Sequence, residues 1–200
     1  MKLKEYIVRE FRSVWNSGPI KIDDHITCLV GKNEAGKTAL LTALYRTNPL
    51  IADHAVFDET YDYPKREVED YRFEVENNDR DEVVVVECLY ELEDADFEVV
   101  SSVFGPNVIK GRNFRRDTYY GKRNSKFILS TDGSEARKHL ANSPSLSDDL
   151  KDALKGAADW DAFSATLETA EATEVIKALK TLVAKILENG LAYYIFNSLI

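Results

Sequence analysis

Residues 31–38 read Gly-Lys-Asn-Glu-Ala-Gly-Lys-Thr and match the phosphate-loop pattern G-x-x-x-x-G-K-[ST] at every fixed position. The apolar residues 26–30 before the loop predict a buried strand, and the apolar residues 39–44 after it predict a helix. A loop of this pattern requires strand, loop and helix in that order. The stretch therefore predicts a nucleotide-binding site in an α/β fold.

The residue types of this loop suit the binding of phosphate. Gly31 and Gly36 allow backbone conformations that are closed to residues with a Cβ, so that successive N–H groups can point at an anion. The helix that follows adds unpaired N–H donors and the positive end of its dipole. We expect Lys37 to reach the β- and γ-phosphates as the catalytic residue, and the Thr38 hydroxyl to hold Mg²⁺ between them. The predicted binding set also includes Asn33, Glu34, Ala35 and Ala39.

The composition is that of a folded, soluble protein. Of the 200 residues, 44% are hydrophobic, which is enough for the core of one domain with an appendage. There is no N-terminal apolar signal segment, and no run approaches the roughly 18 apolar residues of a membrane span. We therefore expect a cytoplasmic protein without a membrane partner. Cys28 and Cys88 lie in apolar strand-like runs without metal-ligand spacing, which predicts buried, reduced thiols.

The segment before the loop carries a resemblance to a known family. Residues 5–11 have strand-like composition and end in Phe-Arg-Ser, residues 16–19 predict a turn, and residues 20–22 predict a short strand. Together with the loop, this arrangement resembles the N-terminal lobe of the ABC-type ATPases of the SMC, RecF and OLD group, in which Asn33 is typical of the loop. The resemblance implies ATP as the nucleotide and places Arg12 and Ser13 close to it. The alternative for Arg12 is an ordinary solvated side chain.

A second part of the resemblance follows the loop. The string Asp-Tyr-Pro-Lys-Arg at residues 62–66 is similar to one in OLD-like and defence-associated ATPases. In the wider ABC class this neighbourhood carries a glutamine that helps to hold magnesium and the attacking water, but this sequence contains no glutamine. A carboxylate, Asp58 or Asp62, would have to replace it. Asp62 is therefore the predicted metal ligand beside Thr38, and a solvated loop acid is the alternative.

The middle of the chain predicts an antiparallel β layer. In the resembling ATPases, a layer of this kind flanks the nucleotide core. Residues 83–90 form the most strand-prone run. An acidic stretch after them opens a short predicted helix that ends before Gly105. Residues 112–120 and 125–130 predict a hairpin, and residues 131–134 predict a turn. The expected fold is thus an α/β P-loop NTPase core of the ABC and SMC-head type with a flanking antiparallel layer.

A basic segment coincides with the predicted hairpin. Cations and aromatic residues alternate there against a single acid, Asp117, although the whole chain has a net charge of −9 that opposes non-specific attraction to a polyanion. Such a mixture could neutralise a nucleic-acid backbone and stack on bases. The alternative is a solvated strand face with core aromatics behind it. The cations are Lys110, Arg112, Arg115, Arg116, Lys122, Arg123 and Lys126, of which Arg112, Arg115, Arg116, Lys122 and Arg123 are the predicted DNA contacts.

The last part of the chain predicts helices, which divides the chain into an ATPase lobe at residues 1–140 and a helical segment at residues 141–200. Ser143 or Ser147 can start the first helix, a second runs from about residue 161, and a third covers residues 175–187 until Gly190 stops it. In the resembling heads a helical insertion begins at this point. A simple bundle packed on the core is the alternative.

Several elements of an ABC-type ATPase are not found in the sequence. These are the Leu-Ser-Gly-Gly signature, an apolar strand ending in Asp-Glu, and a switch histidine. Residues 83–87 come too early for that strand, and residues 193–196 are followed by Asn197 instead of an acid. We therefore expect the N-terminal portion of a longer ATPase, in which hydrolysis needs elements outside this chain.

The functional prediction is an ATP- and magnesium-binding ATPase part that acts in DNA repair or phage defence. The resemblance implies a homodimer through the ATPase heads, since the signature is then supplied by a second head. One alternative is a nucleotide-sensing regulatory module that acts through a partner protein without hydrolysis. A GTP-binding switch is a further alternative, but the chain has no Asn-Lys-x-Asp string for guanine recognition.

Overall fold

A computed structural model describes residues 1–122 and 125–199, which separate into two compact units. The first, here called the P-loop unit, comprises Lys2–Glu91 and Arg115–Ile128. The second, here called the helical unit, comprises Met1, Leu92–Phe114 and the chain from Leu129 onward. The predicted division after residue 140 lies inside the helical unit, at the C-terminal end of one of its helices.

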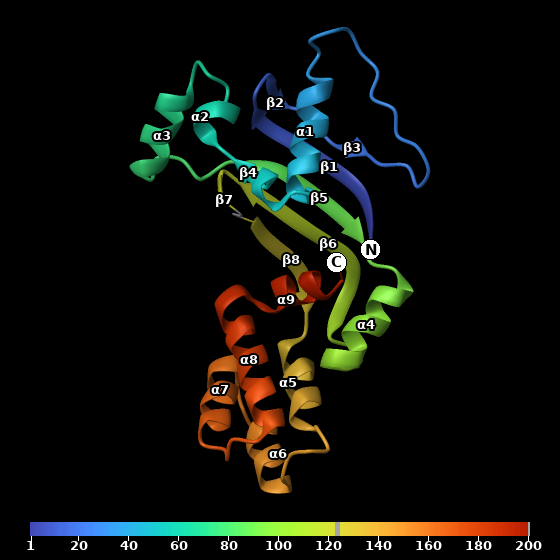
Figure 1. The fold of residues 1–200 in the computed structure, drawn as a ribbon, viewed down its shortest axis with the longest axis vertical. Coiled ribbons are helices and arrows are strands. Elements are labelled where there is room, and N and C mark those ends of the chain that lie inside the picture. Colours follow the sequence, from blue (N-terminus) through green and yellow to red (C-terminus); the bar gives the residue numbers. More distant parts are fainter. Residues whose placement is uncertain (123–124, 200) are drawn as a thin grey trace. The chain divides into compact units, whose positions relative to one another are not determined.

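Strand β1 (Lys2–Phe11) organises the P-loop unit. It pairs antiparallel with β2 (Val14–Asn16), with β3 (Ile20–Lys21) and with β5 (Val84–Glu91), as Figure 1 shows. The strand order of the sheet is β2-β1-β5-β6-β8, with β3 attached to β1. The strands predicted at residues 5–11, 20–22 and 83–90 are therefore confirmed.

The chain reverses tightly at the end of β1. Phe11 pairs with Val14, so Arg12 and Ser13 are the two residues of the turn. Two-residue hairpin turns favour positive φ angles, and Arg12 has φ +55°. The pairing of β1 with β2 therefore fixes the position of Arg12 and Ser13 independently of the phosphate loop.

Helix α1 (Lys37–Thr47) follows the phosphate loop and packs on β1 and β5. Its buried face carries Ala39 and Ala43, which join the core formed by Tyr6, Val8 and other side chains of the sheet. Small residues on this face let the helix backbone approach the sheet closely. The helix predicted after the loop is confirmed.

The strand predicted at residues 26–30 is wrong. These residues form no regular secondary structure, and Figure 1 shows the chain between β3 and α1 as a trace without an arrow. Ile26 is 77% exposed, Val30 is 93% exposed, and Cys28 is exposed as well, so the predicted burial of Cys28 is also wrong. Strand propensity alone does not form a strand, because the backbone N–H and C=O groups need a partner strand, and the described residues provide none here.

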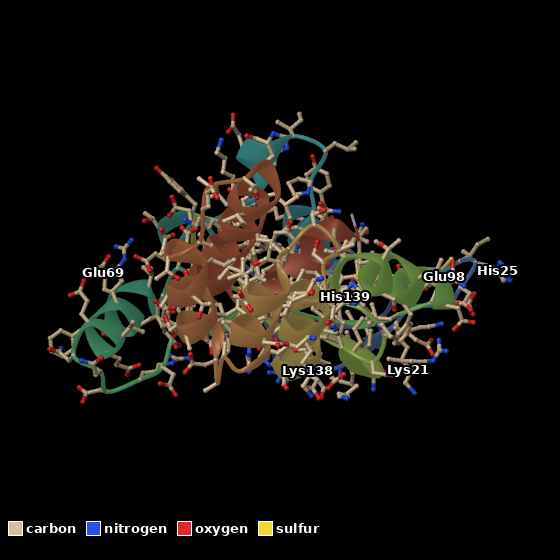
Figure 2. The ribbon with its side chains drawn as sticks, turned by 90° about the horizontal axis from the view of Figure 1, so that it is seen from below. Lys21, His25, Glu69, Glu98, Lys138 and His139 are labelled. Atoms are coloured by element: carbon tan, nitrogen blue, oxygen red, sulfur yellow. The ribbon has the colours of Figure 1, made fainter. Side chains whose placement is uncertain are left out.

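Short elements complete the P-loop unit. The 3₁₀ helix η1 (Ala52–His54) precedes β4 (Val56–Phe57), which pairs antiparallel with β7 (Gly121–Lys122). Helix α2 (Glu59–Asp62) begins after Asp58, whose carboxylate accepts a hydrogen bond from the Thr60 N–H. Helix α3 (Val68–Glu76) follows, and Figure 2 shows its Glu69 side chain pointing outward.

The helical unit contains six helices among the described residues. They are α4 (Asp94–Phe104), α5 (Gly133–Ala141), α6 (Asp148–Lys155), α7 (Trp160–Glu168), α8 (Glu174–Asn189) and α9 (Leu191–Ser198). Strands β6 (Ile109–Tyr119) and β8 (Ser125–Thr131) form the predicted hairpin. None of the helices in the described part of the chain is both long and apolar enough to cross a membrane.

Side-chain caps explain where most of these helices begin. Ser147, Asp159 and Thr173 each accept a hydrogen bond from a backbone N–H in the first turn of α6, α7 and α8. Asp132 does the same for α5 by accepting from the N–H groups of Ser134 and Glu135. The turn predicted at residues 131–134 is thus wrong, because the Asp-Gly-Ser string that resembles a turn is the N-terminal cap of a helix.

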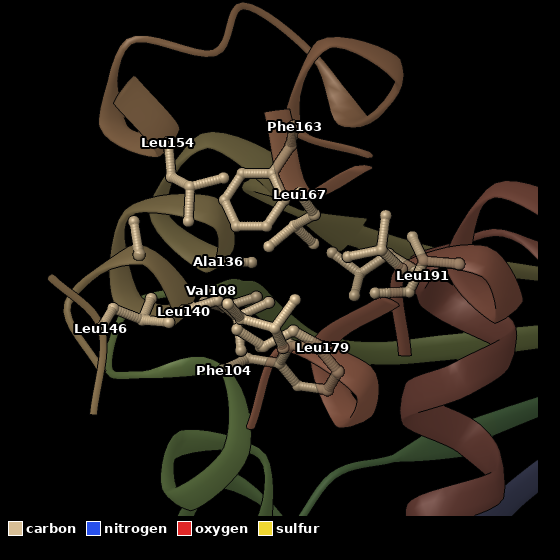
Figure 3. Packing of buried hydrophobic residues seen from close by; sticks show 14 of the residues in the cluster. Phe104, Val108, Ala136, Leu140, Leu146, Leu154, Phe163, Leu167, Leu179 and Leu191 are labelled. Carbon is tan, nitrogen blue, oxygen red and sulfur yellow. The ribbon is translucent and has the colours of Figure 1, made fainter. Parts of the chain in front are cut away.

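The helices of this unit enclose their own hydrophobic core. Figure 3 shows Phe104 of α4, Leu140 of α5, Leu154 of α6, Phe163 of α7 and Leu179 of α8 packed together. The apolar spacing predicted for the last three helical segments therefore marks their buried faces. Polar side chains such as Glu98 of α4 and Lys138 of α5 point outward in Figure 2.

The two cysteines should differ sharply in reactivity with a water-soluble disulfide reagent at pH 8. Cys28 is exposed, whereas Cys88 is buried and burial raises its pKa to about 11, so that little thiolate is present. We expect one thiol per chain to react in the native protein and two after denaturation. Cys28→Ser should abolish the native reaction and Cys88→Ser should leave it unchanged. Two unreactive native thiols would show that residues 26–30 are buried.

Candidate phosphate-binding site

The phosphate loop and the turn after β1 line one cavity of about 490 Å³ in the P-loop unit. The loop alone could not form this cavity, because the turn residues come from a separate part of the sequence. Two of the predicted binding residues, Gly31 and Ala35, do not line it. The residues that do are Arg12, Ser13, Asn33, Glu34, Gly36, Lys37, Thr38 and Ala39.

The Lys37 ammonium group lies across the loop. Its Nζ donates hydrogen bonds to the carbonyl oxygens of Gly31 at 2.8 Å and Lys32 at 2.7 Å. An ammonium group has three donors, so one N–H of Lys37 is left without an acceptor among the described residues. The carbonyl contacts explain why Gly31 matters to the site although it does not line the cavity.

Helix α1 begins directly at the cavity. Its N-cap residue, Gly36, has φ +82°, and no side chain caps the first turn. The first turn also carries no acidic residue. The N–H groups at this end are therefore left for an anion, which the helix dipole favours as well.

The loop lies very close to the turn after β1. A Cβ atom built on Gly36 would come within 3.1 Å of Val14 Cγ2 and 3.5 Å of Ser13 Oγ. The second glycine of the pattern therefore serves two purposes here, since it supplies a left-handed backbone and makes room for the β1–β2 turn.

Arg12 is held by its backbone and by its side chain. Its N–H donates to the carbonyl oxygen of Asp62 at 2.5 Å, and its Nε donates to Asp62 Oδ1 at 3.0 Å. The guanidinium also lies 5.0 Å from the centre of the Phe11 ring. Arg12 is therefore fixed against the buried end of β1. An ordinary solvated arginine, which was the predicted alternative, would not make these contacts.

Asp62 is 1% exposed and lies between two arginines. Oδ1 accepts from Arg12, while Oδ2 accepts from Arg46 Nη1 and, at 3.2 Å, from the backbone N–H of Asp58. Asp62 lines a neighbouring cavity of about 510 Å³ that it shares with Arg12 and Arg46. It does not line the phosphate-loop cavity. Magnesium coordination by Asp62 stays a prediction that this geometry does not favour.

A second hydrogen-bond network supports the same end of β1. Glu10 has φ +47°, and its carboxylate accepts from Tyr63 Oη and from Arg80 Nη2, the latter at 2.6 and 2.8 Å. Tyr120 Oη donates to the Glu10 carbonyl oxygen. Burial is the main reason why the pKa of Tyr63 is raised strongly, so the phenol stays a hydrogen-bond donor. Sequence reasoning missed this network, since nothing in the local pattern relates these positions.

The cations that the structure describes in the basic hairpin do not form one free surface. Lys110 and Arg112 belong to the helical unit and pair with Asp132 at 3.2 Å and Asp94 at 2.6 Å. In the P-loop unit, Arg115 pairs with the buried Asp117 at 2.9 Å. Arg116 of the same strand bonds to Ser125 and lies over the Phe127 ring. Arg123 and the side chain of Lys122 lie outside the described part of the structure.

These pairings support the alternative in which the hairpin is a strand face with its own counter-ions. The aromatic residues behave as that alternative expects, because Phe114 and Tyr120 are buried. Burial also raises the pKa of Asp117, an effect that the neighbouring Arg115 opposes. The DNA contacts assigned to this segment stay predictions.

Together, the phosphate loop, the uncapped start of α1 and the lysine across the loop define a P-loop nucleotide-binding domain. The chain belongs to the AAA ATPase domain family, whose model matches residues 1–186. It is thus an ATP-binding ATPase domain, as the resemblance predicted. No curated protein matches the chain.

One similar solved chain comes from work on the ATP-driven dimerization and DNA-stimulated activation of SMC ATPases. It is 15% identical to this chain and has a TM-score of 0.38. The alignment covers 92% of this chain and 99% of that chain.

Gly36→Ala should impair nucleotide binding beyond its cost to stability. Gly36 and Gly18 both have positive φ, at +82° and +63°, so alanine at either position should cost about 1–2 kcal/mol of stability. Only at Gly36 does the new Cβ meet neighbouring atoms, whereas nothing lies within 4 Å at Gly18. We expect Gly36→Ala to lose ATP binding in calorimetry while Gly18→Ala binds like the parent. Equal affinities in the two variants would contradict the geometry of the cavity.

Proposed function

We propose that this chain binds ATP together with Mg²⁺ in the phosphate-loop cavity. The observation that carries the proposal is that Lys37, Thr38 and the uncapped start of α1 line one cavity with Arg12 and Ser13. Two cationic side chains and a row of free N–H groups are the groups that a polyphosphate needs. The backbone N–H groups of the loop orient the phosphates, and Lys37 exchanges its carbonyl contacts for phosphate oxygens.

Thr38 suits the magnesium ion. Its side chain is exposed and lines the cavity directly after Lys37. Mg²⁺ prefers oxygen ligands, keeps several waters and is commonly held by one or two protein groups together with substrate phosphates. When bound, the ion would neutralise charge on the phosphate oxygens. The hydroxyl of Thr38 can supply the protein ligand without any change in the fold.

Hydrolysis is proposed to depend on groups from outside the described residues. Phosphoryl transfer to water needs a residue that positions the water, in addition to charge stabilisation. Glu34 is the one carboxylate among the described residues that lines the cavity, and it belongs to the loop itself. A water-positioning acid would come from another segment or from a second head in an ATP-dependent homodimer.

The wider activity is proposed to be an ATPase of the SMC, RecF and OLD type that acts on DNA in repair or phage defence in the cytoplasm. The resemblance of the loop, of the Phe-Arg-Ser end of β1 and of residues 62–66 supports this proposal. The cavity supports the phosphate-loop part of this proposal, and the resemblance supports the DNA part.

Lys37→Ala should abolish ATP binding in calorimetry with magnesium. The variant removes the ammonium group that lies across the loop, whereas Lys32→Ala removes an equal charge from an exposed position of the same loop. We expect at least a roughly hundredfold loss of affinity for Lys37→Ala, about 3 kcal/mol, and a much smaller loss for Lys32→Ala. Equal losses would indicate only general charge attraction, and no binding by the parent would refute the proposal.

Neutralising Arg116 and Lys122 together should weaken DNA binding if the basic segment contacts DNA. We expect Arg116→Gln/Lys122→Gln to lower the affinity for short duplex DNA and to reduce the salt dependence of binding by about one unit of slope per lost phosphate contact. Fluorescence anisotropy at several salt concentrations measures both quantities. Lys177→Gln, an exposed lysine of α8 paired with Glu174, is the control. An unchanged slope would favour the regulatory module with a protein partner.

A further inference from the structure

We infer that Asp62 is a positioning residue that holds Arg12 in place for the bound nucleotide. This inference rests on the proposed function, since it explains how Asp62 and Arg12 would contribute to ATP binding. Arg12 lines both the phosphate-loop cavity and the neighbouring cavity, whereas Asp62 lines only the neighbouring one. Asp62 can therefore act on the nucleotide through Arg12.

The contacts between the two residues restrain Arg12 at two points. The Asp62 carbonyl oxygen accepts the Arg12 backbone N–H at 2.5 Å, and Asp62 Oδ1 accepts Nε at 3.0 Å. A non-glycine residue with φ +55° has a strained backbone, and strained residues of this kind persist where their surroundings hold them. The backbone contact from Asp62 is one such restraint on the turn.

The side-chain contact leaves the reactive end of the guanidinium available. Asp62 binds Nε, and the two terminal nitrogens of Arg12 have no hydrogen-bond acceptor in the part of the chain that the structure describes. The Arg12 side chain is 41% exposed. Terminal guanidinium nitrogens form the paired hydrogen bonds that phosphate oxygens accept. An arginine fixed at Nε and free at its tip is suited to bind an anion.

The charged side chains that line the phosphate-loop cavity also favour an anion. Asp62 pairs with both Arg12 and Arg46, and the Arg46 side chain is 20% exposed. Arg46 lies in the last turn of α1, so Asp62 ties the end of that helix to the turn that carries Arg12. The phosphate-loop cavity is lined by two cations, Arg12 and Lys37, and by one carboxylate, that of Glu34.

A double-mutant cycle in ATP affinity tests the inference. We expect Asp62→Asn to weaken ATP binding about tenfold in the parent, which corresponds to about 1.4 kcal/mol, a coupling expected for contacting groups. In the Arg12→Met background the same substitution should change the affinity by less than about twofold, because no guanidinium is left to position. An equal loss in both backgrounds would overturn the inference and show that Asp62 is merely structural.

The same cycle distinguishes positioning from magnesium coordination. Each variant is measured with magnesium and again with EDTA in its place. Positioning through Arg12 predicts the same loss for Asp62→Asn under both conditions. A loss that appears only with magnesium would overturn the inference and assign Asp62 to the metal.

Thermal melts show whether Asp62→Asn prevents folding. If it does, Arg12→Lys provides a second test in which Asp62 stays intact. Lysine keeps the charge but has no Nε–H for Asp62 to accept. We expect Arg12→Lys to lose ATP affinity nearly as much as Arg12→Met, and parent-like binding would overturn the inference. Loss of binding in Lys37→Ala shows that the proposed function holds, so a cycle without coupling would refute only the positioning by Asp62.

Discussion

The buried end of β1 is the constraint on which the phosphate-binding arrangement depends. Phe11 is fully buried, while Glu10 and Arg12 on either side of it have positive φ angles. Asp62 accepts hydrogen bonds from Arg12, Tyr63 donates one to Glu10, and these bonds hold this reversal of the chain. Without it, Arg12 and Ser13 would not meet the loop, and this cavity would not form.

Polar groups with low exposure carry this arrangement, and each of them is paired. Asp62 binds two arginines, and the carboxylate of Glu10 binds Tyr63 and Arg80. Removing one partner from such a group leaves a polar atom without its hydrogen bond, which costs more than an ordinary surface contact contributes. The networks therefore favour a single geometry of the turn over its alternatives. A nucleotide that meets a turn already fixed in place loses less conformational entropy on binding.

The helical unit has a different source of stability. Its helices bury an apolar core of their own. Most of them begin at side-chain caps, and several end at Gly105, Asn142, Gly156 and Gly190. The P-loop unit combines a sheet, one long helix and polar networks. This difference agrees with a chain in which one part binds the nucleotide while the other part folds around a separate core. The AAA ATPase domain model nevertheless spans both units, so the helical unit belongs to the family pattern.

The sequence by itself determined the features that depend on neighbouring residues. The phosphate loop, helix α1, the capped start of α6, the end of α8 at Gly190 and the strand-prone run of β5 were all predicted, because loop pattern, capping and apolar spacing act over a few residues. The family was also predicted from such local strings. The tertiary structure alone decided whether residues 26–30 form a strand, because a strand needs a partner from elsewhere. It likewise decided the setting of Asp62, which meets Arg46 across 16 residues and Arg12 across 50, since only the folded chain brings such positions together.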